Sequence, residues 1–161
     1  AYGEAFSKEA EEIFWQMSVV EDALTAVEVG VRDDGVTSMH DATECGVWGG
    51  LVEVAQASKV GVIVDREAVI LQPAVKTICE HYGIDPYTSI SEGSLIVTVR
   101  PHKAAEVLSR LADKGIAATE VGEVLPAEAG IRVSEDGRER PLAHPKVDPF
   151  WAAFGKAASE A

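Results

Sequence analysis

Val36-Thr-Ser-Met-His-Asp-Ala-Thr-Glu-Cys-Gly-Val-Trp-Gly-Gly-Leu51 is the stretch that decides the fold of this chain. It begins as a β-prone run and passes through a polar turn that contains three glycines. An apolar helical pattern follows, and it predicts a helix that begins at Gly49 or Gly50 and ends near Ser58. The stretch therefore predicts a strand, a glycine-containing loop and a helix start, in that order.

This arrangement predicts an anion site. Backbone N–H groups at a helix start lack internal partners and carry partial positive charge, and glycine lets the backbone approach a ligand closely. We therefore expect the amides between Met39 and Leu51 to form a concave cradle. The stretch has neither a Gly-Lys-Ser/Thr ending nor a G-x-G-x-x-G pattern, so the expectation rests on the helix start alone.

Composition limits the classes of partner. The chain has 161 residues, of which 47% are hydrophobic and 25% charged, as in a globular domain. Its formal net charge of −13 would repel nucleic acids and anionic membranes, so neither is expected as a partner. A small phosphorylated ligand is still compatible with this charge, because backbone amides and a metal ion can bind it locally.

Cysteine usage and the absence of targeting signals predict a cytoplasmic protein. Cys45 and Cys79 make no disulfide framework and are expected to be reduced thiols. Neither a signal peptide nor an apolar run long enough for a membrane span is present in the sequence. The chain begins without Met, which leaves open a fragment or a processed protein.

Residues 1–30 are predicted to form one leading helix. Ser7 is a fitting cap, apolar residues recur at helical spacing from Ala10 to Val27, and Gly30 is a fitting stop. This stripe is expected to pack on the sheet, and the alternative is that it lies along a missing neighbour. We divide one domain of 161 residues into this helix, a core (31–125), and a hairpin with a tail (126–161).

Strands and helices alternate through the rest of the chain. Pro73 and Pro101 mark the starts of two helices that end at Gly83 and Gly115. The predicted strands are 60–64, 88–90 paired with 95–99, 117–124, and a hairpin over 131–140 that turns at Asp136-Gly137. The tail is either a docking helix or a frayed end. These patterns predict an α+β fold, with helices packed on a mixed, largely antiparallel sheet.

Met39-His-Asp-Ala-Thr-Glu-Cys-Gly-Val-Trp-Gly-Gly-Leu51 resembles the D-x-T-x-G-G-L glycine loop of the aminoimidazole ribonucleotide (AIR) synthase superfamily C-terminal domain. Further features follow in the family's order: Gly61-Val-Ile-Val64, Cys79-Glu-His-Tyr-Gly-Ile-Asp-Pro86, Ser91-Glu-Gly-Ser-Leu95 and Val121-Gly-Glu-Val124. The match covers roughly Ser18 to Val124, and the joint order of the motifs carries it. Within the superfamily, the chain is similar to archaeal-type, HypE-like hydrogenase maturation proteins.

The resemblance implies the C-terminal part of a two-domain enzyme. In full-length members an N-terminal domain dimerises and carries most of the Mg-ATP site, and the C-terminal domain closes over it with the glycine loop. Members use ATP to phosphorylate an oxygen of the substrate, although the acceptor differs in thiamine-phosphate kinase and selenophosphate synthetase. No N-terminal half is recognisable here, so we expect no ATPase activity and no bound cofactor for this chain alone. The implied partners are that ATP-binding domain and, in the full-length protein, a second copy.

Two departures from the family pattern matter. Cys45-Gly46-Val47-Trp48 lengthens the loop, and Trp48 either lines a substrate pocket or covers the edge of the core. HypE proper ends in a cysteine that accepts a carbamoyl group, whereas this chain ends Ala158-Ser-Glu-Ala161. If that end is genuine, it argues against HypE activity.

Asp41 is the candidate catalytic residue, which would orient a metal-bound phosphate or a substrate hydroxyl. Its alternative role is to cap the turn through nearby N–H groups. The candidate phosphate- or substrate-binding residues are His40, Thr43, Glu44, Gly46, Gly49, Gly50, Glu92, Gly93 and Ser94.

These candidates also have structural alternatives. His40 is an acid or base, or a structural residue; Thr43 binds a phosphate oxygen or caps the loop. Glu44 would repel phosphate unless a cation intervened. Residues 92–94 face the glycine loop across a cleft or form an ordinary hairpin turn. Cys45 would need a base and an exposed, low-pKa setting to act as a nucleophile. The remaining histidines are scattered, so no metal site is predicted.

Two functions remain open from the sequence. The first is the substrate side of an ATP-dependent AIR synthase-like enzyme. The second is a binding or oligomerisation module without chemistry, in which the leading helix and the aromatic tail form a partner surface.

Overall fold

The structure, a computed structural model, describes residues 2–160 and contains two β-sheets with helices around them. The strands are β1 (Val36–Ala42), β2 (Gly61–Asp65), β3 (Ser94–Val99), β4 (Gly122–Leu125), β5 (Ile131–Glu135) and β6 (Arg138–Pro141). The helices are α1 (Gly3–Glu12), α2 (Val20–Val27), α3 (Gly46–Ser58), α4 (Pro73–Tyr82), α5 (Ala104–Asp113) and α6 (Pro149–Glu160). Short 3-10 turns include η1 (Ile13–Gln16), η3 (Arg66–Ala68) and η4 (Pro101–Lys103).

The predicted α+β class is confirmed, and pairing is mixed but largely antiparallel. β1 and β3 form a two-stranded antiparallel ribbon. The other sheet has the order β4-β2-β5-β6, in which β2 and β5 are parallel and the other neighbours are antiparallel. The strands thus divide into two sheets where the sequence had predicted one.

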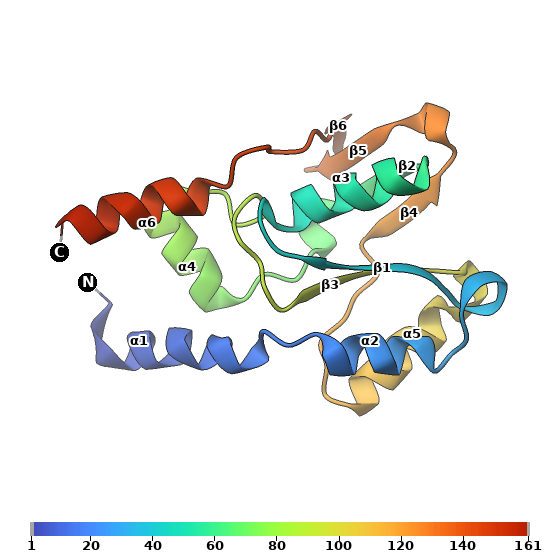
Figure 1. Cartoon of the computed structure of the whole chain (residues 1–161), viewed down its shortest axis with the longest axis horizontal. Coiled ribbons are helices and arrows are strands. Elements are labelled where there is room, and N and C mark those ends of the chain that lie inside the picture. Colours follow the sequence, from blue (N-terminus) through green and yellow to red (C-terminus); the bar gives the residue numbers. More distant parts are fainter. Residues whose placement is uncertain (1, 161) are drawn as a thin grey trace.

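Helix α3 lies between the two sheets, and this position explains its apolar sequence. Leu51, Val52 and Ala55 join Val62 and Val64 of β2 and Val133 of β5 in one buried cluster. Val52, Val64 and Val133 are fully buried, and each such side chain contributes about 1.5–3 kcal/mol of hydrophobic stabilisation. On the opposite side of the ribbon lie α2 and α5, as Figure 1 shows.

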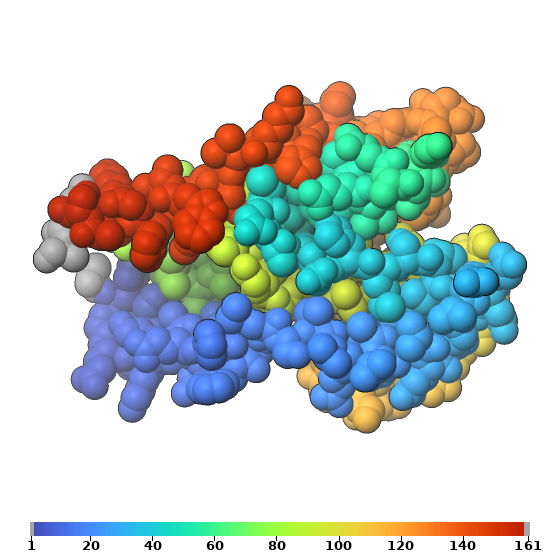
Figure 2. Space-filling model, in the orientation of Figure 1, coloured from blue at the N-terminus to red at the C-terminus, as the bar shows by residue number. Residues whose placement is uncertain are grey.

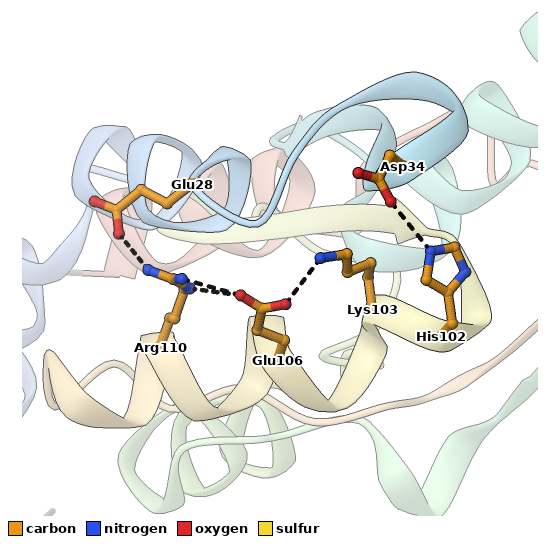
Figure 3. A network of polar contacts seen from close by, with 6 residues as sticks. All are labelled: Glu28, Asp34, His102, Lys103, Glu106 and Arg110. Carbon is orange, nitrogen blue, oxygen red and sulfur yellow. Dashed lines mark hydrogen bonds and ion pairs between the residues drawn. The ribbon is translucent and has the colours of Figure 1, made fainter.

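A second apolar cluster joins α2 and α5 to the ribbon. Ala26 and Val29 pack with Val107 and Leu111, and Val36 of β1 completes the cluster. A chain of ion pairs borders it (Figure 3). The Arg110 guanidinium contacts Glu28, directly after α2, at 3.2 Å and Glu106 at 2.9 Å, and Lys103 contacts Glu106 at 3.0 Å. Because these charges are half-buried or exposed and so remain in contact with solvent, we attribute the packing of α2 on α5 mainly to the apolar cluster.

The predicted single leading helix is wrong. The chain forms α1, continues as the 3-10 turn η1, and resumes as α2 only at Val20. The aromatic rings of Tyr2 and Phe6 pack together, and Tyr2 also contacts His81 of α4. α2 packs instead on α5, so the two halves of the apolar stripe from Ala10 to Val27 pack against different elements. The space-filling view shows α1 and α2 along one edge of the molecule (Figure 2).

Three further predictions need correction. Residues 88–90 do not form a strand, and β3, which was predicted to pair with them, pairs with β1. Within 117–124 only the stretch from Gly122 onward is a strand, and α3 begins at Gly46 where the sequence had predicted Gly49 or Gly50. By contrast, the β5–β6 hairpin and the helix from Pro73 to the left-handed Gly83 are confirmed. Within residues 2–160 no helix is both long and apolar enough to span a membrane.

Candidate functional site

The loop after β1 is closed by a second loop, residues 85–94. Trp48 donates its backbone N–H to the carbonyl of Tyr87 at 3.0 Å, and Ser91 donates its N–H to Thr43 at 3.2 Å. A Cβ at Gly46 would lie 2.6 Å from the carbonyl oxygens of both Tyr87 and Ser89. Gly46 also has a φ of +64°, so both backbone conformation and space require glycine there.

The start of α3 is not an open cradle, which corrects the sequence-based expectation. The N–H groups of Gly46 and Gly49 are donated to the carbonyls of Thr43 and Cys45, and that of Trp48 to Tyr87. The N–H of Cys45 is donated to a carboxylate oxygen of Asp148 at 2.7 Å. A carboxylate from the C-terminal segment therefore lies where the sequence had predicted an exogenous anion.

Gly49 and Gly50 are buried packing positions in the structure. A Cβ at Gly49 would lie 2.8 Å from the Cβ of Cys45, and one at Gly50 would lie 2.8 Å from the Cδ1 of Ile96. Both glycines therefore let α3 approach its neighbours closely. Gly50 sets the distance between α3 and the ribbon, since Ala42 and His40 are its other neighbours.

The two predicted site segments do lie at the same end of the ribbon. Ala42 pairs with Ser94 and Asp41 with Leu95 in the β1–β3 ladder, and the side chains of Asp41, Glu44 and Glu92 are exposed nearby. Gly93 has a φ of +91°, and a Cβ there would lie 2.7 Å from the carbonyl of Gln16. The end of η1 therefore lies against one side of Gly93, which is otherwise exposed, and Asp41, at 71% side-chain exposure, is accessible as well.

A hydrogen-bonded chain of three side chains surrounds one carboxylate. The two oxygens of Glu53 on α3 contact the Nε2 atoms of His40 at 2.7 Å and His144 at 3.3 Å. These bonds, that of His40 first, lower the pKa of Glu53. Within residues 2–160 no group of His, Cys, Asp or Glu is arranged to bind a metal ion, so we interpret the chain as hydrogen-bonded. It borders a surface groove of about 300 Å³ between α3 and residues 38–40.

Cys45 and Trp48 belong to the core. Burial raises the pKa of the Cys45 thiol, and the charges of Asp148, Glu53 and Glu44 raise it further, which disfavours a nucleophilic thiolate. Trp48 is buried and stacks on Tyr87 at 5.0 Å between ring centres, while the Arg66 guanidinium lies 4.4 Å from the Tyr87 ring. Of the two alternatives for Trp48, the structure therefore favours a covering of the core.

Glu53, His144 and Asp148 were not among the sequence candidates. Asp148 lies 103 residues from the amide that it accepts, and His144 lies 91 residues from Glu53. Neither contact has a local signature. The only contact of this group that is close in sequence is that of His40 with Glu53, which are 13 residues apart. Even this contact could be predicted only from the knowledge that α3 folds back on β1.

Comparison with known proteins identifies relatives of this chain. A family model described as AIR synthase related protein, C-terminal domain, matches residues 5–134. The carbamoyl dehydratase HypE of Escherichia coli K12 is 33% identical over 131 residues, 79% of this chain and 39% of that protein. A crystal structure of E. coli HypE has a TM-score of 0.70 at 30% identity, and the match covers 81% of this chain and 41% of that one.

A structure of the hydrogenase maturation protein HypE in complex with ATP is 25% identical, with a TM-score of 0.61 over 68% of this chain and 36% of that one. The chain thus spans about two-fifths of the length of these relatives.

Proposed function

This chain belongs to the AIR synthase related family, as its C-terminal domain, and from that membership we propose that it is the substrate side of a longer, ATP-dependent, HypE-like enzyme. The observation that carries the proposal is the match to HypE over most of this chain but only 39% of the relative. ATP use by the longer protein is supported by the relative whose structure contains ATP. The chain alone would then have no ATP turnover.

The residues present do not fit the phosphates of Mg-ATP at the start of α3. The amides of Cys45, Gly46, Trp48 and Gly49 have internal partners, and the Asp148 carboxylate would repel a phosphate. We therefore assign ATP binding to the other domain of the longer protein and derive no step through the nucleotide.

The exposed residues at the end of the ribbon are the substrate-facing group in this proposal. Asp41 lies near the end of β1 and Glu44 in the loop after it, while the exposed Glu92 precedes β3 and the half-buried Ser94 begins it. Asp41 is positioned as a hydrogen-bond acceptor for a substrate hydroxyl or amide N–H. His40, whose Nδ1 lies 3.8 Å from Asp41, is oriented by Glu53. Thr43 lies in the loop, and Gly46, Gly49 and Gly50 allow the first turns of α3 to pack closely on its neighbours.

The test compares ATP turnover by this chain with that of the protein encoded by its intact reading frame. We expect turnover in the longer protein and none in the chain. Asp41→Asn in the longer protein should lower turnover at least tenfold, whereas the matched Asp113→Asn, at the exposed end of α5, should not. An intact reading frame that encodes no further domain would contradict the proposal. Equal ATP turnover by the Asp41→Asn and Asp113→Asn variants would contradict it as well.

The second candidate, a partner-binding module without chemistry, is favoured by one observation. Phe14, Trp15, Val20 and Leu24 are exposed along η1 and α2, and Trp15 is 76% exposed. A surface of this kind often marks a protein interface. Sedimentation of the chain discriminates the candidates, since a stable oligomer whose melting temperature is indifferent to nucleotide would favour the module.

A further inference from the structure

The C-terminal segment crosses the start of α3, and its contacts there are few and polar. We define residues 142–150 as the strap. It begins at Leu142, which is buried in the core and donates its N–H to Ile131, and it ends in the first turn of α6. In the space-filling view this segment lies directly against α3 (Figure 2).

Between its ends the strap has no regular secondary structure and no buried apolar side chain. The residues between Leu142 and Asp148 are half-buried or exposed, and Val147 is 77% exposed. Segments with few buried apolar contacts open locally at a small fraction of the global stability. Two side chains therefore determine whether the strap stays docked, namely His144 and Asp148.

Asp148 connects two helices. It is 5% exposed; its Oδ2 accepts the N–H of Cys45 at 2.7 Å, and its Oδ1 accepts that of Phe150 at 2.8 Å. No side chain of α3's own N-terminal turn caps that helix, because Cys45 is left-handed and makes no cap bond. One carboxylate thus caps both α3 and α6, at the positive end of each helix dipole.

His144 supplies the other attachment. Its Nδ1 accepts the N–H of Lys146 at 2.9 Å, so the proton shared with Glu53 is on Nε2. The same Nε2 would lie 3.4 Å from a Cβ at Gly49, and the other close neighbours of that position are the Cβ of Cys45 and the carbonyl oxygen of Glu44. The strap therefore contacts the backbone of Cys45 through Asp148 and lies beside the first turn of α3 through His144, where the Cys45 side chain is buried.

We propose that the strap is a releasable cover of the α3 start, and that release of α6 and exposure of Cys45 are one event because Asp148 caps both helices. When the strap lifts, the N–H of Cys45 loses its internal acceptor and the first turn of α3 becomes accessible. This device is independent of whether the chain is part of an ATP-dependent enzyme.

The test uses the rate at which a maleimide labels Cys45, in the full chain carrying Cys79→Ser so that Cys45 is the single thiol. Asp148→Asn should accelerate labelling about tenfold, as expected for the loss of a charged cap shared by two helices. Glu53→Gln weakens the contacts of residue 53 with His144 and His40 but leaves both Asp148 contacts in place, so it should accelerate labelling by a smaller factor. The matched control is Glu44→Gln, which also removes a charge that raises the pKa of the Cys45 thiol but leaves the Asp148 and His144 contacts in place, and it should change the rate far less than Asp148→Asn.

Amide hydrogen exchange provides the second measurement. In Asp148→Asn, exchange in residues 45–49 and 150–154 should rise together, while β2 and β5 stay protected. Unchanged Cys45 labelling would overturn the proposal. Faster exchange in α6 alone would also overturn it, because the two helices would then be uncoupled. An equal loss of protection in β2 and β5 would overturn it too, because the variant would then unfold globally.

Discussion

Gly46 shows how tightly one residue is constrained by the closed loop. Gly83 has nearly the same φ, +66° compared with +64° at Gly46. Of these two positions, only Gly46 would place a Cβ against backbone atoms. Gly83→Ala should therefore cost about 1 kcal/mol from conformation alone, and Gly46→Ala about 1–3 kcal/mol more from the clash with Tyr87 and Ser89. Urea unfolding of both variants measures this. Equal losses would show that the 85–94 loop does not close on Gly46 in solution.

Glu53 predicts a pH dependence of stability. Because hydrogen bonds from His40 and His144 lower its folded pKa below the ordinary 4.5, its contribution is present above pH 4.5 and is lost as pH falls through the folded pKa. Its side chain is 52% exposed, so solvent screening limits the effect to at most about 1 kcal/mol. Glu53→Gln should thus be less stable than the parent at pH 7, with a difference that shrinks in acid.

Urea unfolding between pH 7 and pH 4 tests this prediction, and Glu123→Gln on β4 controls for the change in net charge. A difference between Glu53→Gln and the parent that grows as the pH falls would contradict the assignment of Glu53 as acceptor for both histidines.

At the site, the sequence predicted which residues lie in the β1–α3 loop but not which groups close it. Asp41, Thr43 and Glu44 are placed by local strand and turn patterns. Asp148, by contrast, reaches Cys45 across 103 residues, and local patterns carry no information about such a contact. The expectation of free amides was wrong because partners distant in sequence, Asp148 and Tyr87, accept the N–H groups of Cys45 and Trp48, and local carbonyls accept those of Gly46 and Gly49.

The interrupted leading helix shows what periodicity omits at the scale of elements. Apolar spacing continues from Ala10 to Val27, yet α1 contains no buried residue and α2 buries Thr25 and Ala26. The spacing of the apolar residues indicates an apolar stripe, but it does not indicate that the two halves of the stripe pack against different elements. The backbone of Gly93 packs against Gln16 and Met17 where the two halves separate. Helix starts at Pro73 and the β5–β6 hairpin were predictable because their signals are local.

The packing of α2 on α5 provides a prediction at the same scale. Leu111 is buried in the apolar cluster, whereas Arg110 next to it is half-buried and belongs to the ion-pair chain. Leu111→Ala should cost about 2–5 kcal/mol in the free energy of unfolding, and Arg110→Gln should cost clearly less. Thermal or urea unfolding ranks the two variants. A larger loss for Arg110→Gln would show that the ion pairs, rather than the apolar cluster, determine this interface.

The net charge of the whole molecule predicts how salt affects its stability. The formal charge of −13 repels itself over long distances, whereas the ion pairs act over 2.6 to 3.9 Å. The Debye length falls from about 30 Å at 0.01 M salt to about 10 Å at 0.1 M, so added salt screens the long-range repulsion before it weakens the pairs. The melting temperature should therefore rise with NaCl over this range.

A variant with lower net charge tests this explanation. Glu9, Glu11 and Glu12 of α1 are exposed, and changing all three to Gln takes the formal charge from −13 to −10. The rise in melting temperature with NaCl should then be smaller. A melting temperature that falls with salt would show that the short-range pairs outweigh the repulsion.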